Sequence, residues 1–385
     1  MSVYVCRECA ASYPLDEPIW RCTCGGLLDL SKSSTTPVVV DAGRWSLWRY
    51  RSVLPFAPDA SGWRAVTLGE GVTPLVLEEP DVLLKLDFLM PTLSFKDRGS
   101  AVLVAKAAES GFRRLIADSS GNAGTSIAAY AARAGIAAEV FVPAGTSTNK
   151  VDQLRAYGAA VRQIAGSRQD TAEAAIDRVE TSGDFYASHV YNPLFHHGTK
   201  TFAYEVWEQM GGRVPGTVIV PTGNGTLLLG VAIGFTELVA AGCATHVPRL
   251  VAVQAENCAP VAAAWRGAAS GPGTWGPTAA EGIAIPKPAR LQQMIAAVRS
   301  SDGTFLTVGE EQIVGSRRAL RARGIDVEPT AAATWGAWQA WPDAPATPRP
   351  VVIALSGAGL KSAPRLGRGV QIHDHVCPQR GRHHC

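Results

Sequence analysis

Short apolar runs alternate with glycine-rich turns and alanine-rich segments from about residue 81 onward. The run RRLIAD (113–118) is followed by SSGNAG (119–124) and then by TSIAAYAARAG (125–135). Continuous apolar runs of about four to eight residues are typical of buried strands, and longer alanine-rich runs are typical of helices. The pattern therefore predicts a strand, a turn and a helix in succession.

The same unit recurs along the chain. Apolar runs at 137–145, 217–220 and 351–355 predict further strands, and the segments 150–159 and 227–242 predict helices. Strands that alternate with helices form mostly parallel sheets, with helices on both faces. The predicted fold class is therefore α/β.

Composition and charge exclude several classes of protein. The chain has 385 residues, of which 46% are hydrophobic and 18% charged, so a fibrous or disordered protein is excluded. The net charge is +3, and residues 363–385 carry four arginines against one aspartate, which leaves the body neutral. We therefore expect neither nucleic acid nor a membrane surface as a partner. The tail 367–385 is predicted to be disordered because it lacks apolar periodicity.

The N-terminal sequence predicts a cytoplasmic protein. MSVYVCRECA has no charged segment followed by an apolar one, and no apolar run is long enough to span a membrane. Four of the eight cysteines lie within residues 6–24, which is typical of metal binding or of reduced thiols rather than of secretion.

Three glycine-rich loops follow predicted strands, at 119–124, 221–226 and 356–361. Ligands of open α/β sheets bind beyond the carboxyl ends of the strands, where glycines let the backbone approach an anion. PTGNGT (221–226) is the best candidate for a phosphate site, because its amides and the Thr226 hydroxyl can all donate hydrogen bonds. The alternative is three ordinary strand–helix turns.

The segment PTLSFKDRGS (91–100) contains a candidate nucleophile, Lys96, next to Phe95 and among small residues. A partly buried lysine has a lowered pKa and forms Schiff bases with carbonyl compounds. The alternative is a salt-bridged lysine at the start of a helix. A Schiff-base lysine together with a phosphate loop suggests pyridoxal phosphate, which carries one aldehyde and one phosphate.

An ordered series of motifs over residues 3–366 resembles the threonine synthase family of fold-type II pyridoxal phosphate enzymes. These motifs lie at 46–55, 68–75, 91–99, 119–124, 149–159, 192–201, 252–260, 278–286, 324–332 and 356–361. The resemblance implies two open parallel-sheet domains and a homodimer. It implies a zinc-ribbon-like segment (1–30), a large cofactor-binding domain (31–100 and 161–366) and a small mobile domain (101–160).

The resemblance also implies roles for residues that bind the cofactor. Lys96 would hold pyridoxal phosphate as a Schiff base and transfer protons, with Phe95 packed beside it. Asn122 would bind the 3-hydroxyl group, and Ser356 would face the pyridine nitrogen. A hydroxyl group there leaves the nitrogen largely unprotonated, which favours elimination and replacement over transamination. The cofactor phosphate would be bound by Gly223, Asn224, Gly225 and Thr226.

The resemblance places the substrate at SSGNAG, whose serine side chains and backbone amides (Ser119, Ser120, Gly121, Ala123) would bind its α-carboxylate. Where threonine synthases bind the phosphate of O-phosphohomoserine, the sequence departs from the family. The family's serine, arginine and glutamate are replaced here by Val190, Phe195 and His197. A threonine that is common in the family after the loop asparagine is replaced by Ala123. Loss of the arginine removes a charge-assisted partner for phosphate.

Two interpretations of this departure remain open. In the first, the substrate is still O-phosphohomoserine, because the alignment is shifted by a residue or two or because His189, His196 or His197 takes the arginine's place. In the second, the substrate is an amino acid with an uncharged or smaller leaving group.

The N-terminal cysteines resemble a zinc ribbon, which the family often carries. Cys6 and Cys9 form a C-x-x-C pair, and Cys22 and Cys24 form a tighter C-x-C pair. A structural zinc ion takes four such ligands, and free thiols are the alternative. The His- and Cys-rich tail is assigned no function.

The resemblance therefore implies a pyridoxal-phosphate-dependent carbon–oxygen lyase, namely a threonine synthase or a close paralogue that catalyses elimination or replacement at the β or γ carbon of an amino acid. A true synthase would convert O-phosphohomoserine to threonine. The alternatives are a serine/threonine dehydratase or β-replacement synthase on a non-phosphorylated amino acid. A non-catalytic binding protein is disfavoured, because Lys96, Asn122 and the phosphate loop are all present.

Overall fold

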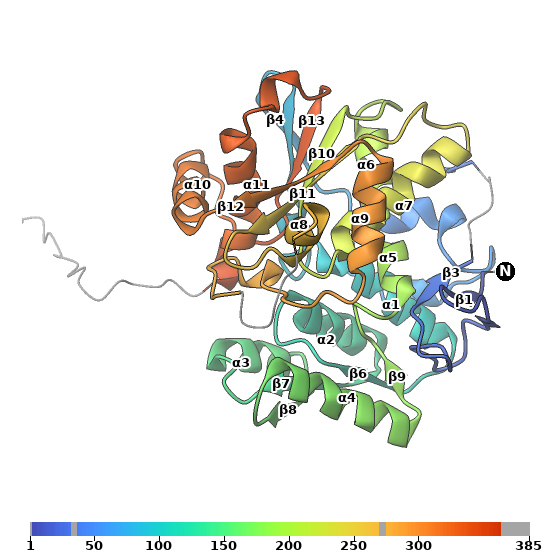
Figure 1. The fold of residues 1–385 in the computed structure, drawn as a ribbon. Helices are drawn as coiled ribbons and strands as arrows, with labels where there is room; N and C mark the ends of the chain where they lie inside the picture. Colours follow the sequence, from blue (N-terminus) through green and yellow to red (C-terminus); the bar gives the residue numbers. More distant parts are fainter. Residues whose placement is uncertain (1, 32–36, 269–274, 363–385) are drawn as a thin grey trace, which may run out of the picture.

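The computed structural model describes residues 2–31, 37–268 and 275–362, which form three sheets and the helices around them (Figure 1). The predicted disorder of 367–385 lies outside the described residues. Mixed helices and parallel strands confirm the α/β class.

The larger sheet has six strands in the order β12-β11-β10-β13-β5-β4, and its edge strand β4 alone runs antiparallel to its neighbour. Its central strands are continuous apolar runs that are buried on both faces, as in other parallel sheets. The strands span Leu75–Glu79 (β4), Val82–Lys85 (β5), Thr217–Pro221 (β10), Arg249–Ala255 (β11), Thr304–Val308 (β12) and Val351–Ala354 (β13).

Helices cover both faces of this sheet. Successive strand residues point to opposite faces, so Val218 and Val220 share a core with α7 and α9, whereas Ile219 shares one with α10 and α11. The helices that flank or support the sheet span Pro193–Thr199 (α5), Thr201–Gln209 (α6), Thr226–Ala240 (α7), Pro260–Trp265 (α8), Leu291–Ser300 (α9), Glu310–Ala322 (α10) and Pro329–Ala340 (α11).

The smaller sheet is fully parallel, in the order β8-β7-β6-β9. It continues to Tyr186, past residue 160 where the predicted small domain ends, and the division into domains stays a prediction. Its strands span Arg114–Ala117 (β6), Ala137–Pro143 (β7), Ala160–Ile164 (β8) and Phe185–Tyr186 (β9). Its helices span Lys96–Glu109 (α1), Asn122–Ala134 (α2), Thr148–Ala156 (α3) and Arg168–Ser182 (α4).

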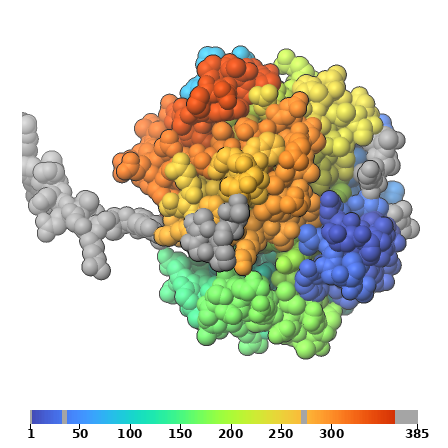
Figure 2. Space-filling view, in the orientation of Figure 1, coloured from blue at the N-terminus to red at the C-terminus, as the bar shows by residue number. Residues whose placement is uncertain are grey.

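The third sheet is antiparallel and belongs to the N-terminal residues, with strands Tyr4–Cys6 (β1), Ser12–Tyr13 (β2) and Leu28–Leu30 (β3). We call residues 2–31 the cysteine module. Figure 2 shows it on one flank of the molecule, beside the region of the smaller sheet.

A buried network of four charges anchors the first turn of α1. Arg98 lies 2.7 Å from Asp87 and 2.8 Å from Glu205, and Lys85 lies 2.5 Å from the same glutamate. Each of the four side chains is almost fully buried. Two cations and two anions balance one another, so the network fixes the backbone that carries Lys96 without leaving a net buried charge.

Within the described residues, no helix is both long and apolar enough to cross a membrane.

Candidate active site

Lys96 is the first residue of α1 and points toward the start of α7. Its Nζ donates a hydrogen bond to Thr226 Oγ1 at 3.0 Å and lies 4.6 Å from the centroid of the Phe95 ring. Burial lowers the pKa of Lys96 to about 7, with Glu328 opposing and Arg168 adding to the shift. No carboxylate of the described chain lies within ion-pair distance of this amine. Lys96 is therefore not the salt-bridged lysine of the alternative interpretation.

The phosphate loop (221–226) lies between β10 and α7, at the carboxyl end of the larger sheet. Gly225 has a φ of 80°, and a Cβ there would lie 2.4 Å from the sulfur of Met294. A Cβ on Gly223 would lie 3.0 Å from the Ile283 backbone. These glycines let the loop lie close against its neighbours, and the first amides of α7 have no partner within the helix, so the loop fits a phosphate group.

Ser356 follows β13, the neighbour of β10 in the sheet, so the two loops lie side by side. Its carbonyl accepts a hydrogen bond from the Phe95 amide at 2.9 Å, which brings it next to Lys96 in the structure. The Ser356 hydroxyl is buried and has no partner among the described residues. A buried polar group without a partner is suited to a ligand atom such as a pyridine nitrogen. These residues therefore fit pyridoxal phosphate.

Asn122, at the start of α2, connects the two parallel sheets. Its Nδ2 atom donates to both carboxylate oxygens of Glu328, each at 3.1 Å. Glu328 precedes α11, and its amide donates to the Gly357 carbonyl at 2.9 Å. Burial raises the pKa of Glu328, although Asn122 and Lys96 act in the opposite direction. A carboxyl group that the sequence analysis did not identify thus lies between the Asn122 and Ser356 loops.

The loop Ser119–Ala123 follows β6 and faces the same region from the smaller sheet. Ser119 Oγ accepts from the Gly121 amide at 3.4 Å, and Ala123 is buried in the first turn of α2. A Cβ on Gly124 would lie 1.7 Å from the Ser119 carbonyl oxygen, so this position needs glycine. Ser120, Gly121 and Asn122 are half-buried, which leaves this loop open to a ligand.

Residues 188–195, which we call the wall segment, follow β9, include the first turn of α5 and lie next to the Lys96 site. The Phe195 ring is fully buried and lies 5.7 Å from Lys96 Nζ and 5.9 Å from the His189 ring. Gly99 makes room for it, since a Cβ there would lie 2.3 Å from the Phe195 ring. The wall segment therefore presents an aromatic ring to the reactive amine.

The three histidines of this region are buried and predominantly neutral near neutral pH. Desolvation lowers the pKa of each well below the ordinary value. The charge of Lys96 lowers the pKa of His189 further, and the charges of Arg290 and Lys96 do the same for His196. At His197, the additional lowering comes chiefly from Lys200. His197 thus experiences the charge of Lys200 rather than that of Lys96.

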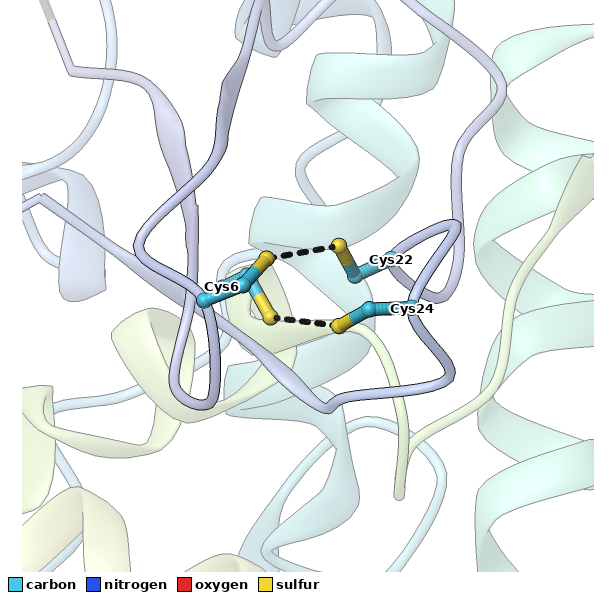
Figure 3. Close-up of side chains that lie close together, drawn as sticks. Cys6, Cys22 and Cys24 are labelled. Atoms are coloured by element: carbon cyan, nitrogen blue, oxygen red, sulfur yellow. Dashed lines mark hydrogen bonds between the residues drawn. The ribbon is translucent and has the colours of Figure 1, made fainter.

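The four N-terminal cysteines converge, as Figure 3 shows for Cys6, Cys22 and Cys24. Their sulfur atoms all lie within 4.8 Å of one another, and the pairs Cys6–Cys24 and Cys9–Cys22 are each 3.5 Å apart. Sulfur atoms around tetrahedral zinc lie about 3.8 Å apart, given Zn–S bonds of about 2.3 Å. The Tyr13 hydroxyl lies 3.0 Å from Cys22 Sγ and is the main cause that lowers the pKa of Cys22 to about 6. This donor set fits a zinc ion.

Two charged residues near the site, Glu328 and Arg168, could not be identified from the sequence around them. Glu328 stands before a proline at a helix start, a position that ordinarily indicates only a helix boundary. Arg168 begins α4, far from Lys96 in the sequence, yet its charge acts on Lys96, Asp118 and His189.

The comparisons with known proteins agree with this geometry. The profile of the family described as "Pyridoxal-phosphate dependent enzyme" matches residues 66–357. Threonine synthase of Methanosarcina acetivorans is 33% identical over 347 residues, which cover 86% of this chain and 84% of that protein. Threonine synthase of Mycobacterium tuberculosis is 33% identical over 323 residues, covering 81% and 87%.

Solved structures extend the likeness to other activities. A threonine deaminase from T.th. is 29% identical with a TM-score of 0.63, covering 72% of this chain and 87% of that one. Maize serine racemase is 20% identical with a TM-score of 0.65, and the match covers 74% of this chain and 88% of that one. O-ureido-L-serine synthase is 24% identical with a TM-score of 0.63, and the match covers 80% of this chain and 93% of that one. At these identities the last two show the fold alone.

Proposed function

Since this chain belongs to the threonine synthase family of pyridoxal-phosphate-dependent enzymes, we propose that it is a lyase for a non-phosphorylated amino acid. The reaction is elimination or replacement of an uncharged or small substituent at Cβ or Cγ. The observation that carries this proposal is the Phe195 ring, 5.7 Å from Lys96 Nζ and 5.9 Å from the ring of His189, whose pKa burial lowers well below its ordinary value.

The residues around Lys96 divide the work of binding the cofactor. Bound pyridoxal phosphate supplies a carbonyl for the substrate's amino group and a conjugated ring that withdraws electrons from Cα. The phosphate loop, which includes Thr226, would bind its phosphate, Ser356 would donate to its ring nitrogen, and Asn122 would bind its ring hydroxyl. Phe95 packs beside the ring and excludes water.

Lys96 is suited to move the proton at Cα. With a pKa of about 7, its amine exchanges between neutral and charged forms near neutral pH, as an efficient acid–base group must. Ser119, Ser120 and the amides of residues 121–124 bind the α-carboxylate of the substrate at the positive end of α2. The substrate's leaving group is then directed toward the wall segment.

The composition of the wall segment argues against a phosphate leaving group. A phosphate dianion next to Phe195 and Val190 would lose its water without gaining a charged partner from the wall segment itself, which costs several kcal/mol. Histidine does not replace the missing arginine, because burial lowers the pKa of His189, His196 and His197 and keeps them uncharged at neutral pH. An uncharged leaving group meets no such penalty.

Phosphate release tests this proposal directly. Purified, cofactor-loaded protein is incubated with O-phospho-L-homoserine, and phosphate and threonine are measured. We expect little release, and turnover instead with a member of a panel of non-phosphorylated amino acids such as serine, threonine and O-acetylated serine. Phosphate release at rates typical of a biosynthetic enzyme would overturn the proposal.

A second candidate is threonine synthase itself, with O-phosphohomoserine as substrate. It is favoured by the threonine synthases at 33% identity and by Arg168, whose positive charge acts on Lys96 and His189. In that case, Arg168→Gln raises the KM for O-phosphohomoserine at least about tenfold, since a charge-assisted contact is lost. Under our primary proposal, Arg168→Gln leaves the KM for the unphosphorylated substrate within about twofold.

We further propose that Cys6, Cys9, Cys22 and Cys24 bind a structural zinc ion, since four thiolates leave no coordination position open for a substrate. Metal analysis of the purified protein is expected to give one zinc per chain. Cys22→Ser, which removes one ligand, is expected to abolish this stoichiometry. The homodimer and the cytoplasmic location stay predictions.

A further inference from the structure

A single buried arginine connects the wall segment to the cysteine module. Arg290 lies before α9 and is 1% exposed. Its Nε donates to the Val190 carbonyl at 2.8 Å, and its Nη2 donates to the Tyr191 carbonyl at 2.9 Å. The guanidinium group therefore holds two successive carbonyls of the wall segment.

The other donors of the same guanidinium group reach β3 of the cysteine module. Arg290 Nη2 donates to the Leu28 carbonyl at 2.9 Å, and Nη1 forms an ion pair with Asp29 Oδ1 at 2.9 Å. The planar, five-donor guanidinium group is the side chain that can satisfy four acceptors on two segments at once. A lysine in this place has three donors from one point and cannot span them.

Two further contacts join the same parts of the molecule. The Trp20 ring of the cysteine module lies edge-on to Tyr191, with centroids 5.2 Å apart, and to Tyr186, with centroids 5.5 Å apart. The Arg290 carbonyl accepts from the Met294 amide, and Met294 packs against Gly225 of the phosphate loop. The arginine thus stands where cysteine module, wall segment and phosphate loop meet.

We propose that Arg290 is a positioning residue that fixes the wall segment to the cysteine module, so that the folded module sets the affinity for the amino-acid substrate. The inference rests on the proposed function in one respect, namely that the leaving group faces the wall segment. Loss of the module's fold then loosens Val190 and Tyr191 while the phosphate loop, built on the larger sheet, keeps the cofactor.

Amide hydrogen exchange of the cofactor-loaded protein tests the link without a substrate. In Arg290→Gln, the amides of Val190, Tyr191 and Asn192 are expected to exchange at least about tenfold faster, because their segment loses two charge-assisted hydrogen bonds. Arg49→Gln is the matched control. It removes a buried arginine that pairs with Glu208 at 2.6 Å elsewhere, and is expected to leave the exchange of 190–192 unchanged.

The cysteine module enters the test through Cys22→Ser. Combined with Arg290→Gln, this change is expected to add little, because both break the same connection. Additive effects of the two changes on exchange at 190–192 would overturn the proposal. So would unchanged exchange in a folded Arg290→Gln protein that keeps its cofactor absorbance.

Two milder variants keep the test decisive where Arg290→Gln does not fold. Asp29→Asn removes the charge at β3, and Arg290→Lys keeps a cation with fewer donors. Both are expected to increase exchange at 190–192, with Arg290→Lys intermediate between wild type and Arg290→Gln. Wild-type exchange in both variants would overturn the proposal.

Kinetics separate this inference from the proposed function. With the amino acid that the panel identifies, Arg290→Gln is expected to raise KM about tenfold while kcat changes less than about twofold. A fall in kcat at unchanged KM would overturn the positioning role. If no unphosphorylated amino acid is turned over, the proposed function fails, and the exchange experiment still decides the link.

Discussion

The phosphate loop and the wall segment both lie next to Lys96 and are built in different ways. The phosphate loop (221–226) is shaped by backbone and glycines, with Gly225 at positive φ against Met294. The wall segment (188–195) presents side chains, among them the Phe195 ring, whose centroid lies 5.7 Å from Lys96 Nζ. A backbone site binds the same anion whatever the neighbouring side chains are, whereas a side-chain site changes its ligand with one substitution. Under the proposed function, the cofactor and the substrate would therefore be specified independently.

The largest expected effect comes from removing the Lys96 amine, which lies next to both regions. Lys96→Ala is expected to lower turnover at least about a thousandfold and to abolish the absorbance of the lysine-bound cofactor, because no other group holds the carbonyl. Lys106→Ala, at the far end of the same helix, should retain both properties. Spectra and turnover of the two proteins make the comparison. Normal turnover by Lys96→Ala would contradict the assignment.

A substitution in the phosphate loop should affect the cofactor and spare the wall segment. Gly225→Ala places a Cβ 2.4 Å from Met294 Sδ at a φ of 80°, so cofactor affinity is expected to fall about tenfold or more. Gly242→Ala imposes similar strain at φ 69°, beyond the other end of α7 and in open space. Equilibrium titration of the cofactor measures both. Equal affinity in the two variants would show that the close approach does not matter.

The reciprocal substitution should affect the wall segment and spare the cofactor. Gly99→Ala pushes a Cβ to 2.3 Å from the Phe195 ring, which is expected to cost about 1–3 kcal/mol of unfolding free energy and to raise KM. Gly315→Ala, in open space within α10, serves as the control and should be neutral or stabilising. Denaturation and cofactor titration are compared. Loss of cofactor affinity in Gly99→Ala would mean that the two regions are not independent.

The smallest expected effect is a pH dependence. The rate at which the apoprotein takes up pyridoxal phosphate requires neutral Lys96, whose pKa of about 7 lies below that of a free lysine. As pH rises, the neutral fraction grows, so the rate is expected to increase about fivefold between pH 6 and 7 and to level off above pH 8. Stopped-flow absorbance measures it. A tenfold rise per pH unit continuing past pH 9 would indicate an ordinary lysine.

Local sequence predicts the phosphate loop better than it predicts the wall segment. The run TVIV followed by PTGNGT predicted a strand, a loop and a helix, which are β10, the phosphate loop and α7. Such units are fixed by short-range propensity and by glycine. The placement of Phe195 next to Lys96 instead needs α5 to cross α1 at Gly99, which local patterns do not contain.

Arg290 and Glu328 show what sequence alone does not reveal. Four of the five acceptors of Arg290 come from residues 28, 29, 190 and 191, and the fifth is Gln293, so the reason for its burial exists only in the folded chain. Glu328 meets Asn122 only because the two sheets face each other. Contacts between distant segments determine where both side chains lie, and no hydrophobic periodicity in the sequence indicates these positions.

The buried network of Lys85, Asp87, Arg98 and Glu205 has a consequence for how this sequence can diverge. Replacing any one of the four leaves an uncompensated buried charge, which typically costs about 3–5 kcal/mol, so evolutionary change there requires paired substitutions. The Val190 side chain belongs to no such network of charges, so a single substitution there leaves no buried charge unpaired. Random drift is thus expected to spare the buried network near Lys96 and to act on the wall segment. If the wall segment faces the substrate as proposed, single mutations there would change the substrate range, whereas the surroundings of Lys96 would change only through paired substitutions.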